Sequence, residues 1–200
     1  MKKKQKTKLI LSLLFLSFSL YFASLTVGYT NKIYPNLVIG TDALFKILPF
    51  VNLSVFSDIF SVIGPILFLI FIFVKKTERK IPYYAIIIGF FYLIRSFFIY
   101  LTPLANPFPL GKWGVDLFPV GGMFPSGHVG VLFLMFLLIK EKSNTKYWAL
   151  TLLLLAILEG TFMIFTRGHY SIDVFGAILV AYAIHSFSEK NLQKRLMLNF

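Results

Sequence analysis

The feature that most constrains this chain is a series of apolar stretches near 20 residues long, separated by short polar and basic segments. Hydrophobic residues make up 58% of the 200 residues, and charged residues only 14%. An α-helix of about 20 apolar residues is long enough to cross the hydrocarbon core of a bilayer. We therefore expect an all-α membrane protein with six transmembrane helices in one bundle. The six stretches are residues 9–28, 56–74, 82–102, 127–139, 147–166 and 171–188.

Length and composition limit the domain organisation. Residues 1–200 suffice for a single six-span domain and leave no room for a second one. The chain has no cysteine, so disulfides, thiolate metal sites and a cysteine nucleophile are excluded. The first apolar stretch follows several lysines, as in a signal peptide, but it is longer than a usual signal core and lacks an Ala-x-Ala cleavage site. We expect it to be retained as the first span.

Basic residues are distributed unevenly between the two ends of the predicted helices. One end carries the amino-terminal lysines, the basic loops after the second and fourth stretches, and the basic tail. The other end carries only Lys32, Lys46, Lys112 and Arg167. Because Lys- and Arg-rich loops stay in the cytoplasm, both termini are predicted to be cytoplasmic, in the plasma (inner) membrane. This topology signal accounts for the net charge of +12 without a nucleic-acid partner.

Two longer loops are predicted on the opposite, extracytoplasmic side. Residues 30–55 contain Pro35, Asp42 and Pro49 among apolar residues, which predicts a short interfacial helix. Residues 103–126 are rich in proline and glycine, which break helices and favour a shaped loop.

A polar island at residues 169–173, with the sequence HYSID, stands at the start of the last apolar stretch. His169 and Asp173 are spaced i, i+4, so they share one helical face. The carboxylate can hold one imidazole nitrogen and leave the other as a nucleophile or base. The alternative is that Asp173 merely stabilises the start of the helix.

A second island, FPSGH at residues 124–128, begins the fourth stretch. Ser126 suits an N-cap, and Gly127 lets backbone amides approach an anion closely. A helix start of this kind is a natural phosphate seat. His128, in the first turn, is then placed to protonate a leaving oxygen while His169 attacks phosphorus. Alone, His128 would more often be structural; the second histidine favours catalysis.

Other charged residues have two interpretations each. Arg95 and Glu159 lie at similar depths in their spans, so they either form an ion pair or, together, aim Arg95 at a phosphate. Arg167 either contacts a phosphate oxygen or anchors at the lipid headgroups. Lys112 and Asp116 lie in the Gly/Pro loop and are weaker site candidates. No His or carboxylate cluster has metal-ligand spacing, so we expect a reaction without metal or cofactor.

These motifs resemble those of a known family. Pro125-Ser126-Gly127-His128 and His169-x-x-x-Asp173 are similar to the second and third signature motifs of the type 2 phosphatidic acid phosphatase superfamily. The closest likeness is to its sphingomyelin-synthase-like branch. That branch shows His-Tyr-x-Ile-Asp-Val, as in residues 169–174, and an arginine before Thr-x-Leu, as Arg95 precedes residues 102–104.

The resemblance implies a nucleophilic His169 oriented by Asp173, with His128 as general acid and Arg95 binding phosphate. The chain also departs from the family. The usual first-motif lysine is absent, with Ile88 at its position. The family usually has an arginine six residues before the third-motif histidine, but this chain has Met163 there. Arg167 is the candidate substitute for that arginine. The synthase branch carries an acidic residue six positions before the second-motif histidine, where this chain has Gly122.

These features predict an enzyme that cleaves a phosphate ester of a membrane lipid through a phosphohistidine, at the extracytoplasmic face. With water as second acceptor it is a lipid phosphatase, and with a lipid hydroxyl it is a headgroup phosphotransferase. From another class of function, the alternative is a non-catalytic membrane scaffold or small transporter, in which Arg95 and Glu159 form a structural or transport-linked pair.

Overall fold

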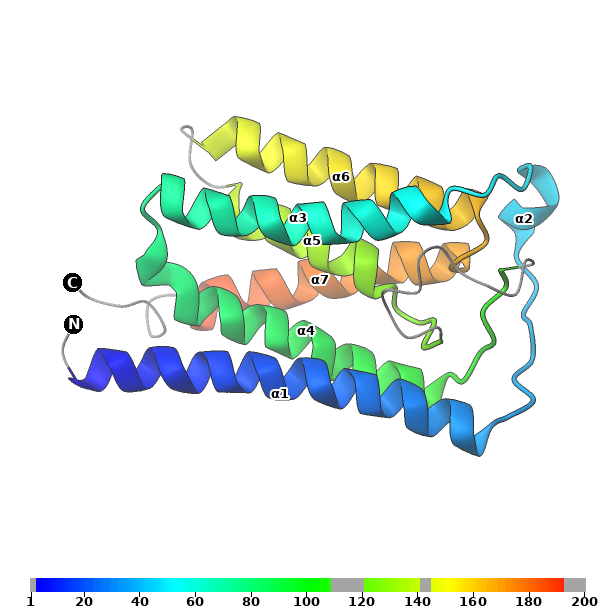
Figure 1. The fold of residues 1–200 in the computed structure, drawn as a ribbon, viewed down its shortest axis with the longest axis horizontal. Coiled ribbons are helices and arrows are strands. Elements are labelled where there is room, and N and C mark those ends of the chain that lie inside the picture. Colours follow the sequence, from blue (N-terminus) through cyan, green and yellow to red (C-terminus); the bar gives the residue numbers. More distant parts are fainter. Residues whose placement is uncertain (1–2, 109–120, 141–144, 193–200) are drawn as a thin grey trace.

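The computed structural model describes residues 3–108, 121–140 and 145–192, and all regular structure within them is helical (Figure 1). The stretches predicted from the sequence are all helices, and a short helix also forms within residues 30–55. The helices are α1 (Lys3–Ile33), α2 (Ala43–Ile47), α3 (Ser54–Val74), α4 (Ile81–Leu101), α5 (Gly127–Ile139), α6 (Lys146–Phe165) and α7 (Ser171–Asn191). A 3-10 turn at Glu78–Lys80 leads into α4.

Helix α5 lies in the middle of the bundle and packs against α3, α4, α6 and α7. Ten of its 13 residues are buried. Thirteen residues span only about 20 Å, less than the roughly 30 Å of a hydrocarbon core. Because neighbouring helices surround α5, its apolar side chains meet protein, and a short helix is sufficient there.

Helix α1 packs along α4 at one edge of the bundle (Figure 1). The contact is close because Gly89 has no side chain: a Cβ there would lie 2.7 Å from Cε1 of Phe15. The other faces of α1 are exposed, as at Leu11 and Tyr21, of which 60% and 63% is accessible. A lipid environment would cover such side chains.

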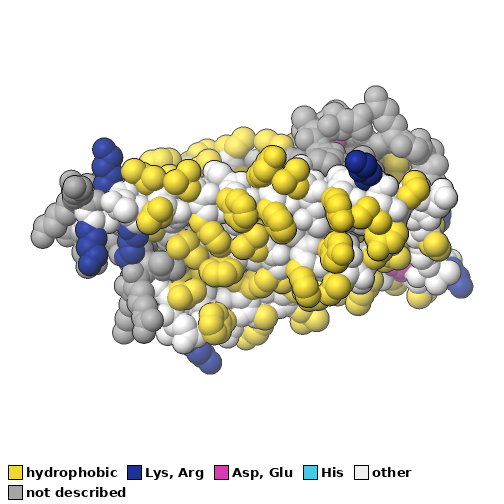
Figure 2. Space-filling view, turned by 90° about the horizontal axis from the view of Figure 1, so that it is seen from below, with side chains coloured by type: hydrophobic (Ala, Val, Ile, Leu, Met, Phe, Trp, Pro, Cys, Tyr) yellow, Lys and Arg dark blue, Asp and Glu magenta, His cyan; other side chains and the backbone are white. Residues whose placement is uncertain are grey.

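The outer surface has the composition of a membrane protein. Figure 2 shows hydrophobic side chains over the middle of one face, with most of the Lys and Arg side chains of that view gathered at one end. In the described ranges, five helices are long and apolar enough to cross a membrane, namely α1, α3, α4 with its preceding turn, α6 and α7. The sixth predicted span is the shorter α5. Which end of the bundle is cytoplasmic stays a prediction.

The first residues of α1 and the last of α7 lie at the same end of the bundle (Figure 1). The starts of α5 and α7 lie toward the opposite end (Figure 1), so the two histidine islands share one end as predicted. A small apolar cluster of Val129, Met163, Val174 and Ala177 packs α5, α6 and α7 together near this end. It gives the two islands a rigid base.

Candidate active site

The island at residues 124–128 folds into a tight entry to α5. The Phe124–Pro125 peptide is cis. Ser126 is the N-cap of α5, and its hydroxyl oxygen accepts a hydrogen bond from the Val129 backbone N–H at 3.5 Å. The predicted N-cap is therefore confirmed. His128 follows in the first turn and lines a cavity.

In the other island, His169 lies just before the helix rather than on it. Helix α7 begins at Ser171, so the expectation that His169 and Asp173 share a helical face is wrong. They meet because Asp173, in the first turn, reaches back over the helix start. Its Oδ2 lies 3.2 Å from Nδ1 of His169 and accepts the Tyr170 backbone N–H at 3.0 Å. Asp173 therefore caps the helix and holds the imidazole with one oxygen.

The two islands are joined to each other. The Ser126 N–H donates to the Asp173 carbonyl oxygen at 3.0 Å, which ties the start of α5 to the first turn of α7. The imidazole rings of His128 and His169 lie 6.2 Å apart, centroid to centroid, at an angle of 67°. Both line the same cavity. The predicted proximity of the histidines is found; their catalytic roles stay predictions.

Arg95 supports the loop that leads to this site. Its Nε donates to the Pro125 carbonyl oxygen at 3.0 Å, and its Nη2 donates to that of Gly122 at 2.7 Å. Gly127 makes the approach possible, since a Cβ there would lie 3.0 Å from Nε of Arg95. A guanidinium carries five N–H groups, so three have no hydrogen-bond partner among the described residues. Arg95 also lines the cavity. Its role as a phosphate ligand stays a prediction.

Glu159 pairs with Ser57 and not with Arg95, so of the two interpretations left open by the sequence the ion pair is wrong. Its Oε1 accepts a hydrogen bond from the Ser57 hydroxyl at 2.6 Å, and the side chain is fully buried between α6 and α3. Its Oε2 has no hydrogen-bond partner within the described part of the chain. Similar depth in two predicted spans could not tell in which direction each helix points its side chain.

Arg167 lies against the outer loops. Its backbone is left-handed, with φ 56°, and its Nη2 donates to the Phe45 carbonyl oxygen at 3.2 Å. The guanidinium also stacks over the Phe45 and Phe50 rings, at 5.6 and 5.8 Å from their centroids. These contacts anchor α2, and a contact of Arg167 with phosphate stays a prediction. Lys112 and Asp116 lie outside the described residues.

Sequence reasoning missed a latch that fixes the start of α7. Oδ2 of Asp42, the N-cap of α2, accepts the Ser171 backbone N–H at 2.6 Å. The Tyr170 hydroxyl accepts the Gly40 N–H at 2.8 Å and donates to the Ala105 carbonyl oxygen at 3.0 Å. Burial raises the pKa of Tyr170, which keeps this donor protonated. No local pattern predicts contacts between residues some 130 positions apart.

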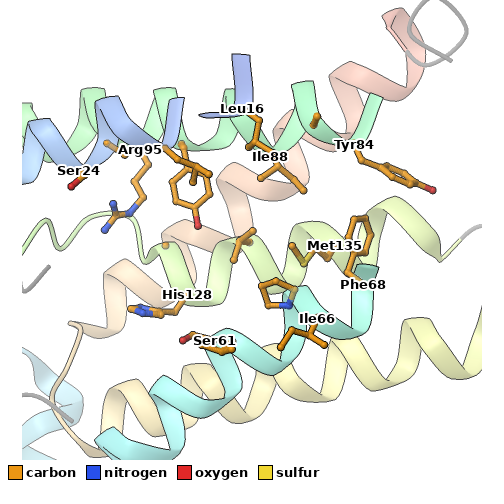
Figure 3. Close-up of a pocket in the computed structure, with 18 of the residues that line it drawn as sticks. Leu16, Ser24, Ser61, Ile66, Phe68, Tyr84, Ile88, Arg95, His128 and Met135 are labelled. Atoms are coloured by element: carbon orange, nitrogen blue, oxygen red, sulfur yellow. The ribbon is translucent and has the colours of Figure 1, made fainter. Parts of the chain in front are cut away.

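The cavity has a volume of about 710 Å³ and lies between α1, α3, α4 and α5 (Figure 3). Arg95 and His128 stand at one end, and Tyr84 and Phe68 at the other. Most of its wall is apolar. Among the described residues, no group of three His, Asp or Glu side chains is placed to hold a metal ion. The geometry suits an anion bound beside two imidazoles, with a hydrocarbon chain extending below.

Comparison with known proteins agrees with this geometry. Residues 121–190, which contain both islands, match a family model described as the C-terminal part of the PAP2 superfamily. The fold is similar to that in the crystal structure of LpxE from Aquifex aeolicus, with a TM-score of 0.53 and 24% sequence identity. That alignment covers 69% of this chain and 86% of LpxE, and it shows a common fold. No curated protein matches the sequence. Neither comparison singles out the sphingomyelin-synthase-like branch.

Proposed function

We propose that this protein is an integral membrane lipid phosphatase that works through a phosphohistidine on His169. The observation that carries the proposal is the pair of imidazole rings, 6.2 Å apart, at the polar end of a largely apolar cavity. A phosphate fits between such rings, and the cavity suits the lipid chain attached to it. The match of residues 121–190 to the PAP2 superfamily model supports the same reaction class.

In the first step, Nε2 of His169 attacks phosphorus from the side opposite the lipid oxygen. The bond between phosphorus and nitrogen forms as the bond between phosphorus and the lipid oxygen breaks. His128, in its protonated form, gives the leaving alkoxide a proton. Asp173 holds the proton of His169 on Nδ1, at 3.2 Å, so Nε2 keeps its lone pair. The positive charge that develops on the ring is stabilised by the carboxylate.

In the second step, a water molecule attacks the phosphohistidine. His128, now neutral, accepts the proton of this water, and phosphate leaves as His169 regains its free Nε2. The three unused N–H groups of Arg95 provide donors for the phosphate oxygens. Amides at the Ser126–Gly127 start of α5 add the partial positive charge of a helix amino terminus.

Water is the preferred acceptor in this proposal, since the family model names a phosphatase superfamily and neither comparison favours the synthase branch. A non-catalytic scaffold or transporter is less favoured, because it gives no reason for an imidazole held by Asp173 to lie close to a second imidazole. We also propose that the site faces the extracytoplasmic side of the inner membrane, as the distribution of basic residues predicts.

The test is a panel of lipid phosphates assayed in mixed micelles, with and without a lipid alcohol such as diacylglycerol or ceramide. We expect free inorganic phosphate in both arms, at equal rates, and none from His169→Ala. Thermal unfolding of the variant should match that of the wild type. A headgroup transferred to the added alcohol, with little free phosphate, would replace the hydrolase with the phosphotransferase. Full activity in His169→Ala would exclude the phosphohistidine.

A further inference from the structure

The phosphate end of the cavity has fewer cationic side chains than the family motifs predict. Ile88 and Met163, at the positions where the family usually has a lysine and an arginine, line the cavity as apolar side chains. Arg167, the candidate substitute, is held by α2 and does not line the cavity. A phosphate bound beside His169 therefore depends on neutral donors in addition to Arg95.

One neutral side chain at this end has donors to offer. Asn106 is half-buried and lines the cavity, as Gly168 and His169 do. Its Oδ1 accepts a hydrogen bond from the Phe108 backbone N–H at 2.9 Å. Because the oxygen of an amide group accepts and its nitrogen donates, this contact turns Nδ2 away from the backbone. Among the described residues, Nδ2 donates to no protein group, so its two N–H groups can serve a ligand in the cavity.

The backbone on both sides of Asn106 is held in place. The Ala105 carbonyl oxygen accepts the Tyr170 hydroxyl at 3.0 Å, and Phe108 packs against the apolar cluster beneath the two islands. Tyr170 directly follows His169, so the loop that carries Asn106 is fixed to the segment that carries the proposed nucleophile. A donor that is held in advance loses little conformational freedom when a ligand binds.

Building on the proposed phosphatase activity, we infer that Asn106 is a substrate-binding residue whose Nδ2 donates to a phosphoryl oxygen of the lipid phosphate. Arg95 supplies donors from α4, the start of α5 supplies backbone amides, and Asn106 supplies donors from the loop that Tyr170 clamps. The phosphoryl group keeps its charged oxygens when it moves from the lipid oxygen to His169. Asn106 therefore stabilises both the bound ester and the phosphohistidine.

Two substitutions separate the donor from the turn that it belongs to. Asn106→Asp keeps an oxygen for the Phe108 N–H and replaces the donor with a negative charge. Asn106→Ala removes the donor without adding a charge. Asn52 is the matched control position, because its Oδ1 also accepts the N–H two residues on, from Ser54 at 3.2 Å, and it does not line the cavity.

The readouts are kcat/KM for the best substrate of the lipid phosphate panel and the Kd of the phosphate analogue orthovanadate. The Kd is obtained from the rise in melting temperature that orthovanadate causes. Loss of a hydrogen bond to a charged oxygen predicts a kcat/KM and an affinity about ten- to 100-fold lower in Asn106→Ala, and a loss at least as large in Asn106→Asp. Asn52→Ala and Asn52→Asp should keep the wild-type values. A purely structural Asn106 would instead lower the melting temperature without orthovanadate and leave the Kd unchanged.

An unchanged Kd and kcat/KM in either folded Asn106 variant would overturn the inference. A loss confined to Asn106→Asp does so too, because a nearby negative charge weakens anion binding without any hydrogen bond. Both results leave the proposed phosphatase intact, since the wild-type protein still releases phosphate. A wild-type protein that hydrolyses none of the lipids, while both Asn106 variants bind orthovanadate more weakly, would remove the phosphatase activity and keep the anion site. A wild-type protein that neither binds orthovanadate nor releases phosphate would overturn both.

Discussion

Asp173 carries the most direct link between fold and proposed chemistry. Its Oδ2 accepts the Tyr170 backbone N–H and lies 3.2 Å from Nδ1 of His169. Replacing it with asparagine keeps an oxygen of the same size but removes the negative charge. The start of α7 should survive, because the amide oxygen of asparagine can still accept the Tyr170 backbone N–H. The phosphorylated imidazole of the intermediate would lose its carboxylate.

The size of the effect follows from these contacts. A hydrogen bond to a charged group contributes about 1.5–3 kcal/mol, roughly twice a neutral one or more. Loss of the charge from the His169 contact should lower kcat about tenfold to 100-fold. If the amide group turns and donates to Nδ1, His169 is held in the wrong tautomer, and the loss approaches 10⁴-fold, as in serine protease triads.

Asp42→Asn provides the matched control for Asp173→Asn. Asp42 also accepts a backbone N–H at the start of α7, from Ser171 at 2.6 Å, and it has no contact with His169. Both variants lose a carboxylate near the helix start, worth about 0.3–1 kcal/mol, so their melting temperatures should fall by similar amounts. Steady-state phosphate release should separate them, with kcat lost mainly in Asp173→Asn. Equal losses of kcat in the two variants would refute the argued role of Asp173.

Two further predictions concern packing. A Cβ at Gly176 would overlap the Phe124 ring, so Gly176→Ala should lower the free energy of unfolding by about 1–3 kcal/mol. The control Gly28→Ala, with open space around its Cβ, should be neutral or stabilising. Denaturation in detergent tests both variants, and a Gly176→Ala protein as stable as the wild type would contradict the packing. Glu159→Gln keeps an oxygen for Ser57 and needs no buried charge, so it should unfold within about 1 kcal/mol of the wild type, while Glu159→Ala should lose about 2–5 kcal/mol. A large loss in Glu159→Gln would show that the carboxyl group itself is needed.

Much of the fold could be predicted because membrane helices are specified locally. An apolar stretch must form a helix in hydrocarbon, since no water is there to bond its backbone. The bounds of α5, Gly127–Ile139, therefore match the predicted stretch, although the helix is shorter than a bilayer. The proximity of His128 and His169 also followed, because topology put both islands at one end of the bundle.

The features that could not be predicted depend on how each helix is oriented about its own axis and on how the loops fold back. The Arg95–Glu159 ion pair is absent because depth in a span does not determine the direction in which a side chain points. Arg95 instead binds the carbonyl oxygens of Gly122 and Pro125, which belong to a loop without regular structure. The contact of Asp42 with α7 depends on a loop fold that no residue pattern encodes.

The most direct test of the account is to trap the covalent intermediate. The purified protein is mixed with a lipid phosphate labelled in its phosphoryl group, quenched in alkali within milliseconds, and mapped by mass spectrometry. The account predicts a phosphoryl group on His169, stable in alkali and released in acid, and none in His169→Ala. A label on another residue, or steady turnover by His169→Ala, would contradict the phosphohistidine mechanism.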